Sequence, residues 1–338
     1  MKALWFTDLH LRPNHAASSK KALEFILKSA KEKKPDIAIC TGDVFHTKNI
    51  LYASMLDQFR DFLLELTKIC PVYLAPGNHD YGLEYEVHAL SNFKNLKNVT
   101  VVDEAMKITP DVGLMSYARQ KERFEFLREQ IKGVKYLFGH FDMNGFDLGS
   151  GWEEKESWSD PEQFMSFKKI FSGHYHLHQV KLIKDTEFIF CGTSYTTEFG
   201  ESDQEKYIML VDLKNGNWEK ITTNLTLHKT IKIKAGDDFP KVSDKDINEG
   251  LEYRVIVSGT KEQLELIKPP KDYPAIVIKQ FMTVSAERLD VSASEKKEDV
   301  LKKFVQFEMK NKADILKDID QERLLSLGHK LLSKVNRS

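Results

Sequence analysis

The sequence predicts an α/β fold in which two packed mixed sheets are flanked by helices, followed by a small α+β domain and a C-terminal helical segment. Three patterns predict this architecture. Short apolar runs alternate with amphipathic stretches over the first 140 residues, short strands follow one another after about residue 187, and two helical patterns end the sequence. Strands separated by helices of this length are typical of βαβ units and a largely parallel sheet.

The first region alternates strand and helix patterns, as βαβ units require. Short apolar runs that end at polar residues predict strands at 3–6, 36–40, 72–75 and 136–138. Apolar residues at helical spacing predict helices at 18–34 and 50–68. Helix 50–68 is strongly apolar, so we expect one of its faces in the core.

After residue 187 the spacing between apolar runs shortens. Runs at 188–191, 207–211 and 218–221 predict short strands, and the turn signal Lys214-Asn215-Gly216-Asn217 joins the last two as a hairpin. We therefore expect a second sheet packed beside the first, and a domain that closes near residue 225.

Two further regions follow this domain. The alternating residues 229–236 predict a half-buried strand, and 253–257, 260–267 and 275–279 read as strand, helix and strand. The Lys/Glu-rich end carries helical patterns at 296–310 and 313–335 whose apolar stripe is too large to stay exposed. We expect this apolar stripe to pack either on the chain's own core or on a partner protein. The predicted domains are 1–225, 226–290 and 291–338.

Composition excludes several classes of protein. The 50 basic and 51 acidic residues give a net charge of −1, which excludes a globally basic nucleic-acid coat. A hydrophobic content of 41% suffices for sizeable cores, and no apolar run approaches the roughly 20 residues of a membrane span. Three cysteines fit a reducing compartment, and the early Asp8 does not fit a secretory signal peptide. We expect a cytoplasmic protein with no membrane association.

Five short polar motifs stand at or just after the ends of predicted strands. Ligands of open α/β sheets bind outside the carboxyl ends of strands, so these motifs can meet at one crevice. Their glycines permit tight turns and a close approach of the backbone to an anionic substrate. The motifs are Asp8-Leu9-His10, Gly42-Asp43-Val44-Phe45-His46, Gly77-Asn78-His79-Asp80, Gly139-His140 and Gly173-His174-Tyr175-His176.

Together the motifs supply the mixed nitrogen and oxygen donors that two divalent cations need. Asp8 and His10 are two residues apart and can reach one ion, whereas the two oxygens of Asp43 can bridge both ions. Each motif alone has an ordinary structural explanation, because Gly-Asn is a turn signal and alternating histidines can be exposed strand residues. Six of the eleven histidines fall inside the motifs, which favours a metal site.

The five motifs in this order resemble the calcineurin-like metallophosphoesterase superfamily, over residues 1 to about 220. The resemblance implies a layered α/β metallophosphoesterase sandwich with a dinuclear metal centre. Protein Ser/Thr phosphatases of this superfamily carry Asp-Arg-Gly after the second motif and GNHE at the third, whereas this chain has GDVFH and GNHD.

Within the superfamily, GDVFH resembles the SbcD-type DNA-repair nucleases, the subunits that partner an SbcC-type coiled-coil ATPase. Residues 139–146, 172–176 and 190–194 are similar to the phage branch of this family, typified by the recombination nuclease subunit of T-even phages. Arg12 departs from the pattern, since many relatives have glycine there. The similarity to a bacteriophage branch implies action in the cytoplasm of an infected host.

The resemblance implies two divalent metal ions, Mn²⁺ first and Mg²⁺ as the alternative. One ion would be held by Asp8, His10, Asp43 and His176, and the other by Asp43, Asn78, His140 and His174. Two more histidines are implied to be catalytic, because His79 would face the phosphate and assist the leaving oxygen, and His46 would help orient the DNA end. His178 has no counterpart in the motifs and is expected to be a polar surface residue, with a position behind one of the metal ligands as the alternative.

The implied function is a Mn-dependent DNA nuclease, with exonuclease activity on double strands and endonuclease activity on single strands. It would act with an SbcC-type ATPase in DNA repair and recombination, with segment 291–338 binding the ATPase and helix 50–68 contributing to a homodimer. Two alternatives stay open: a cyclic-nucleotide or other small phosphodiesterase, and an inactive scaffold. The complete ligand set argues against the scaffold, and the extra domains argue against a minimal phosphodiesterase.

The charge is unevenly distributed along the chain. Residues 1–225 hold 28 basic and 32 acidic side chains, whereas residues 226–338 hold 22 and 19. The acidic excess thus lies where carboxylates would hold cations, and the basic excess where DNA is expected. Lys229, Lys232 and Lys234 lie on one alternating strand, and we expect them on one face. They either contact DNA phosphates or form an ordinary solvated face.

Overall fold

The structure is a computed structural model that describes residues 1–82, 87–149, 153–248 and 250–281. The chain divides into two compact units. The first comprises Met1–Ile233, Asp237–Ile256 and Lys268–Ile278, and the second comprises Lys234–Gly236, Val257–Ile267 and the chain from Lys279. The predicted segment 291–338 and its helical patterns lie outside the described residues, and the predicted domain boundaries stay predictions.

The first unit contains a six-stranded mixed sheet. Four of its strands are parallel, and β11 and β12 extend the sheet with antiparallel pairing. The order across the sheet is β12 (Asn217–Thr222), β11 (Tyr207–Asp212), β1 (Lys2–Phe6), β2 (Ile37–Cys40), β3 (Val72–Leu74) and β4 (Val99–Val101). The strands predicted at 3–6, 36–40 and 72–75 are confirmed.

A second six-stranded sheet has parallel strands at its centre and antiparallel pairs at both edges. Its order is β5 (Ala105–Thr109), β6 (Val112–Met115), β7 (Tyr136–His140), β8 (Lys169–Gly173), β10 (Thr186–Phe190) and β9 (Gln179–Ile183). The expectation that all strands after residue 187 form the second sheet is wrong. β11 and β12 join the first sheet, and β7 belongs to the second. The sequence pattern of a strand does not indicate which sheet the strand joins, because its partner can be distant in the chain, as Val211 of β11 is from Ala3 of β1.

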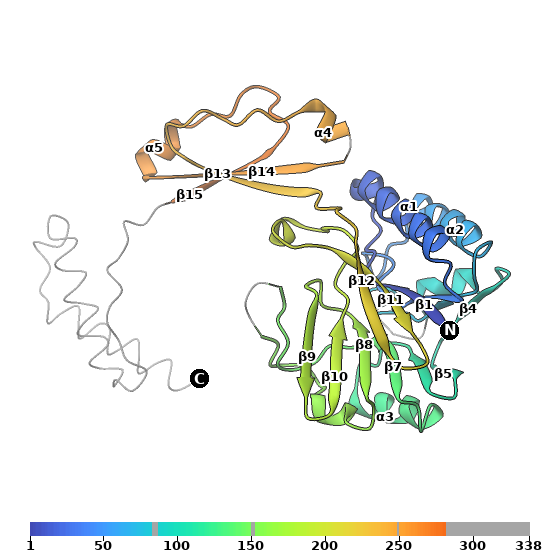
Figure 1. Cartoon of the computed structure of the whole chain (residues 1–338). Coiled ribbons are helices and arrows are strands. Elements are labelled where there is room, and N and C mark those ends of the chain that lie inside the picture. Colours follow the sequence, from blue (N-terminus) through green and yellow to red (C-terminus); the bar gives the residue numbers. More distant parts are fainter. Residues whose placement is uncertain (83–86, 150–152, 249, 282–338) are drawn as a thin grey trace, which may run out of the picture. The chain divides into compact units, whose positions relative to one another are not determined.

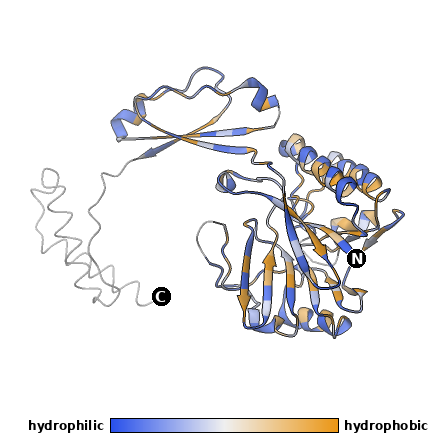
Figure 2. Ribbon diagram, in the orientation of Figure 1, coloured by the Kyte–Doolittle hydropathy of each residue, from blue (hydrophilic) through white to orange (hydrophobic). Residues whose placement is uncertain are grey.

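The two sheets pack face to face around an aromatic core. Trp5 of β1 meets Phe138 of β7 and Phe171 of β8 edge-on, with ring centroids 5.7 and 5.4 Å apart. Helices α1 (Ala16–Lys33) and α2 (Ala53–Leu66) lie side by side on the first sheet (Figure 1), and α3 (Lys121–Gln130) packs on the second. Figure 2 shows hydrophobic residues along these strands and helices. The prediction of two mixed sheets flanked by helices is confirmed.

A three-stranded sheet is formed by β13 (His228–Lys234), β14 (Glu252–Gly259) and β15 (Ile276–Phe281), with short helices α4 (Asp244–Asn248) and α5 (Lys261–Leu266) between them. The predicted succession of strand, helix and strand is confirmed by β14, α5 and β15. Lys229 and Lys232 are an odd number of residues apart, so they face opposite sides of β13, and the expectation that the lysines share one face is wrong. Among the described helices, none is long and apolar enough to cross a membrane.

Candidate metal centre

The five polar motifs lie at the ends of strands from both large sheets. β1 leads to Asp8, β2 to Asp43 and β3 to Asn78, whereas β7 ends at His140 and β8 ends just before His174. Ligands of α/β folds bind at the carboxyl ends of such parallel strands. The structure brings the motifs together there, as the sequence predicts.

The backbone at these strand ends adopts an unusual conformation. Asp8, His10, Asp43 and His174 have φ angles of 52°, 43°, 50° and 97°, in the left-handed region that residues other than glycine rarely adopt. Hydrogen bonds between two motifs hold this geometry, because the Asp8 N–H donates to the Gly42 carbonyl and the His10 N–H to the Asp43 carbonyl, both at 2.9 Å. Strained backbone of this kind is concentrated at functional sites.

Gly173 shows why the last motif begins with glycine. A Cβ atom at this position would lie 2.2 Å from Thr7 Oγ1 and 2.9 Å from Asp8 Oδ2. The same carboxylate accepts the backbone N–H of His174, with both oxygens 3.2 Å from the nitrogen. Glycine therefore lets β8 approach the Asp8 carboxylate closely.

One group of donor atoms converges on the amide oxygen of Asn78. His140 Nε2 lies 2.9 Å and His174 Nδ1 lies 3.0 Å from Asn78 Oδ1, and Asp43 Oδ2 lies 3.5 Å from His140 Nε2. The Nδ1–H of His140 donates to the Thr41 carbonyl at 2.9 Å, so Nε2 is the nitrogen that faces the group. Imidazole nitrogens with amide and carboxylate oxygens at these separations fit one divalent cation.

Asp8, His10 and His176 form a second group on the other side of Asp43. His10 Nε2 lies 2.9 Å from His176 Nε2, 3.7 Å from Asp43 Oδ2 and 3.9 Å from Asp8 Oδ1. Asp43 Oδ2 thus lies between the two groups, as a bridging ligand would. The structure brings all seven predicted ligands together, and their role as ligands stays a prediction.

His79 and His46, the predicted catalytic residues, lie beside the second group. The backbone N–H of His79 donates to Asp43 Oδ1 at 2.8 Å, and its ring Nδ1–H donates to the His46 carbonyl at 2.7 Å. The ring centroid of His10 is 4.9 Å from that of His79 and 5.4 Å from that of His46. Since Nδ1 of His79 is held by a carbonyl, Nε2 is the nitrogen that can meet a substrate.

Burial and mutual charge set the protonation of the centre. Burial raises the pKa of Asp8 to about 6. Burial also acts to raise the pKa of Asp43, but His140 and His10 outweigh it and hold this pKa well below its usual range. Burial acts to lower the pKa of His140, yet Asp43 and Asp8 raise it to about 9. Burial and the charge of His140 lower the pKa of His174 to about 3. In the group around Asn78, His140 is therefore the protonated histidine at neutral pH.

We expect metal binding to release this proton. At pH 7 His140 must lose its Nε2 proton to act as a ligand. Burial acts to lower the pKa of His176, but the hydrogen bond with Glu201 outweighs it and raises this pKa, so His176 adds to the release. At least one proton should therefore leave per protein. Metal affinity should rise with pH up to about 9, where His140 is already half deprotonated, and level off above it. Isothermal titration calorimetry in buffers of different ionisation enthalpy measures the released protons. An affinity that does not change between pH 7 and 9 would contradict this assignment.

Sequence reasoning missed Glu201 and Lys206, a buried ion pair behind His176. Glu201 Oε1 accepts from His176 Nδ1 at 2.6 Å, and Lys206 Nζ lies 2.9 Å from Glu201 Oε2. The backbone N–H and the hydroxyl of Thr197 also donate to Glu201, at 2.9 and 2.8 Å. A carboxylate on the second ring nitrogen orients a metal-ligating histidine. Residues 198–206 are mostly polar and resemble a surface loop, so the sequence carries no signal for this role.

Two other residues make contacts that the sequence did not predict. Asp80, which had no assigned role, accepts hydrogen bonds from two backbone N–H groups of the second motif and from that of Gly77, at 3.0–3.2 Å, and so ties the second and third motifs together. His178, expected at the surface, is half-buried, and its Nδ1–H donates to the Phe190 carbonyl at 2.7 Å. That expectation is wrong.

Comparisons with known proteins agree with this geometry. The family model for calcineurin-like phosphoesterases matches residues 1–259. Protein 244L of Invertebrate iridescent virus 6, provisionally named a phosphoesterase, is 27% identical over 80% of this chain and 98% of its own length. Exonuclease subunit 1 of Enterobacteria phage T4 is 24% identical over 86% of this chain and 85% of its own length.

A solved structure of an archaeal phosphodiesterase matches 66% of this chain and 99% of its own length, at 13% identity and a TM-score of only 0.38. The match to the family model, in contrast, spans both large sheets and every motif of the centre. The chain therefore belongs to the calcineurin-like phosphoesterases, hydrolases that use divalent metals to act on phosphoester bonds.

Proposed function

We propose that this chain is a Mn²⁺-dependent DNA nuclease, with exonuclease activity on double strands and endonuclease activity on single strands. The observation that carries the proposal is the pair of donor groups that share Asp43, an arrangement suited to two-metal phosphodiester hydrolysis. DNA as the substrate is supported by the similarity to exonuclease subunit 1 of phage T4, which extends over 86% of this chain.

The residues of the centre have different proposed roles in hydrolysis. Two divalent cations, when bound, would polarise the phosphodiester and lower the pKa of a bound water to about 7. Asp8, His10 and His176 would hold one cation, Asn78, His140 and His174 the other, and Asp43 both. His79, fixed by Asp43 and by the His46 carbonyl, would donate a hydrogen bond or a proton to the leaving oxygen. His46 would help orient the DNA end.

The nitrogen and oxygen atoms of the proposed ligands also favour some metal ions over others. Imidazole nitrogens make up four of the seven proposed ligands, whereas Mg²⁺ prefers an octahedron of oxygen atoms. Mn²⁺ accepts mixed nitrogen and oxygen donors, so we propose Mn²⁺ as the working metal, with Mg²⁺ as the weaker alternative.

We also propose partners for this activity. They are DNA, an SbcC-type coiled-coil ATPase and a second copy of this chain, acting together in DNA repair and recombination in the cytoplasm of an infected bacterial cell. The support is the resemblance of GDVFH to the SbcD-type nucleases. The predicted ATPase-binding segment 291–338 lies outside the described residues.

A cyclic-nucleotide or other small phosphodiesterase would use the same donor groups. One assay separates the alternatives: end-labelled duplex DNA, circular single-stranded DNA and a cyclic nucleotide are each incubated with the full chain and Mn²⁺. We expect cleavage of both DNAs at rates well above that of the cyclic nucleotide. Hydrolysis of the cyclic nucleotide alone would support the small phosphodiesterase, and no hydrolysis of any of the three would support an inactive scaffold.

A further inference from the structure

Arg12 lies beside the metal centre and has more hydrogen-bond donors than the protein uses. Its Nη1–H donates to His46 Nε2 at 3.0 Å, and its Nη2–H donates to the carbonyl oxygen of Thr197. A guanidinium has five N–H donors and no acceptor. No carboxylate in the described part of the chain forms an ion pair with Arg12. The edge of the centre therefore carries a fixed positive charge that has no ion-pair partner among the described residues.

Two neighbouring N–H groups also lack partners. Because His46 Nε2 accepts from Arg12, His46 carries its proton on Nδ1, and this buried atom has no hydrogen-bond partner within residues 1–82, 87–149, 153–248 and 250–281. The same is true of the buried Nε of Arg12. Buried donors normally have partners, so a surplus of donors around a guanidinium indicates an anionic ligand. Arginine is the side chain best suited to a phosphate.

The position of Arg12 indicates which phosphate it can reach. The ring of His46 separates its guanidinium from the centre, and the centroid of this ring is 5.4 Å from that of His10 and 5.9 Å from that of His79. The His46 side chain thus lies between Arg12 and the rings of His10 and His79, and Arg12 is farther from the metal centre than these rings. A phosphate held by the two donor groups is beyond His46, so the phosphate within reach of Arg12 is a second one on the same strand.

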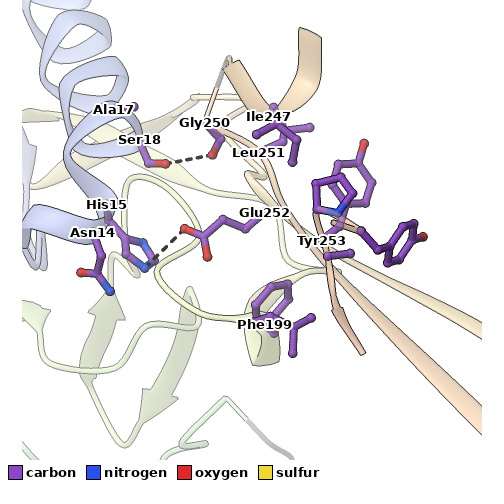
Figure 3. Close-up of a pocket in the computed structure, with 14 residues that line it drawn as sticks. Asn14, His15, Ala17, Ser18, Phe199, Ile247, Gly250, Leu251, Glu252 and Tyr253 are labelled. Carbon is purple, nitrogen blue, oxygen red and sulfur yellow. Dashed lines mark hydrogen bonds and ion pairs between the residues drawn. The ribbon is translucent and has the colours of Figure 1, made fainter. Parts of the chain in front are cut away.

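A cavity of about 570 Å³ lies next to the chain segments that contain Arg12 and Thr197. Figure 3 shows the residues that line this cavity. Asn14 and His15, which follow Arg12, line this cavity, and so does Phe199, two residues after Thr197. The other residues that line the cavity include two tyrosines, Tyr253 and Tyr273, and one carboxylate, Glu252. The volume is within the range of small-molecule sites, and aromatic walls are the surfaces on which bases stack.

We propose that Arg12 and this cavity form a subsite for the nucleotide next to the scissile phosphate, with its phosphate on Arg12 and its nucleoside in the cavity. This inference rests on the proposed nuclease function. A cyclic nucleotide has a single phosphate and cannot place one phosphate at the metal centre and a second on Arg12, whereas a DNA strand can. The subsite therefore makes Arg12 a residue that selects oligonucleotides over small diesters.

A chemical double-mutant cycle tests the phosphate contact. The substrate is a short single strand with one natural linkage, phosphorothioates elsewhere, and a neutral methylphosphonate in place of one neighbouring linkage at a time. We expect Arg12→Ala to lower kcat/KM on the charged strand by about 10- to 100-fold, as for the loss of a charge-assisted hydrogen bond, and Arg12→Lys to lower it less. On one strand the methylphosphonate replaces the phosphate that Arg12 contacts. On this strand Arg12→Ala should cause no further loss of kcat/KM.

The matched control is Arg123→Ala, an exposed arginine of α3 whose Nη2 lies 2.9 Å from Glu104 Oε1. Its small effects should be the same on charged and methylphosphonate strands. If Arg12→Ala lowers kcat/KM on every methylphosphonate strand by the same factor as on the charged strand, Arg12 binds no substrate phosphate and the proposal is wrong. Failure of the wild-type chain to cleave any DNA would instead contradict the proposed nuclease function.

The nucleoside part of the subsite has its own test. Ala17 is exposed on α1 and lines the cavity, so Ala17→Trp fills the cavity without disturbing the core. We expect this variant to lower kcat/KM by about 10-fold on the natural strand, as for the loss of one stacked base, and to have no effect when the neighbouring residue is abasic. Lys28→Trp, exposed on the same helix, is the control for an added tryptophan. Equal losses on natural and abasic strands would show that no base enters the cavity.

Discussion

Replacing Asp43 with asparagine should lower kcat/KM for DNA hydrolysis by about 10³-fold or more, since a metal ligand of this kind stabilises transition-state charge by several kcal/mol. Asp43 Oδ2 lies 3.5 Å from His140 Nε2 and 3.7 Å from His10 Nε2, so the variant removes an anion that lies between the two donor groups. Asparagine keeps the size of the side chain and one acceptor oxygen, so the change isolates the charge.

Metal content distinguishes this loss from misfolding. After dialysis against Mn²⁺, elemental analysis should find fewer ions in Asp43→Asn than in the wild-type chain. The control is Asp185→Asn, an exposed carboxylate in the turn between β9 and β10, which should bind Mn²⁺ and hydrolyse DNA as the wild type does. Hydrolysis by Asp43→Asn within about tenfold of the wild type would contradict the role of Asp43 as a shared ligand.

The centre could be predicted largely from the sequence because each motif is local and follows an apolar strand. Asp8 comes two residues after the end of β1 and His140 ends β7, so the end of a short apolar run already marks the place of each side chain. The carboxyl ends of parallel strands share one edge, and this physical rule brings together residues that are far apart in the chain. The same reasoning placed Asp43, Asn78 and His174.

Contacts between distant segments could not be predicted in this way. β11 completes the first sheet by pairing with β1, and nothing in the run 207–211 indicates which sheet it joins. Glu201 meets His176 across 25 positions of sequence, from a polar stretch that resembles a solvated loop. The link from Arg12 to the carbonyl of Thr197 spans 185 positions. The missed residues are therefore those whose role depends on tertiary packing alone.

Replacing Glu201 with glutamine should destabilise the fold and weaken metal binding together. The Lys206 side chain is 1% exposed and would lose the anion that lies 2.9 Å from its ammonium, which costs about 3–5 kcal/mol for a buried pair. His176 would lose the carboxylate to which its Nδ1–H donates, and removal of such a partner lowers metal affinity by about 10- to 100-fold. Urea unfolding measures the first effect, and titration with Mn²⁺ measures the second.

The pH dependence of stability provides a further check on this pair. Burial acts to raise the pKa of Glu201, but the hydrogen bond from His176 and the charge of Lys206 outweigh it and hold this pKa well below its ordinary value of 4.5. The stabilisation is therefore complete above about pH 4.5 and is lost as the pH falls below it. In Glu201→Gln, the free energy of unfolding should depend less on pH in this acidic range.

The double variant Glu201→Gln/Lys206→Met separates the two effects. Methionine fills a similar volume without a charge, so the double variant contains no unpaired buried ammonium and should recover most of the unfolding free energy. It still lacks a carboxylate at His176, so its Mn²⁺ affinity should stay about 10- to 100-fold below that of the wild type. If the double variant regains metal affinity together with stability, Glu201 acts on the fold alone and does not position His176. If it regains neither, the lost stability comes from lost hydrogen bonds, either those of Thr197 or those that Lys206 donates to the His176 carbonyl and Gln204, and not from an unpaired ammonium.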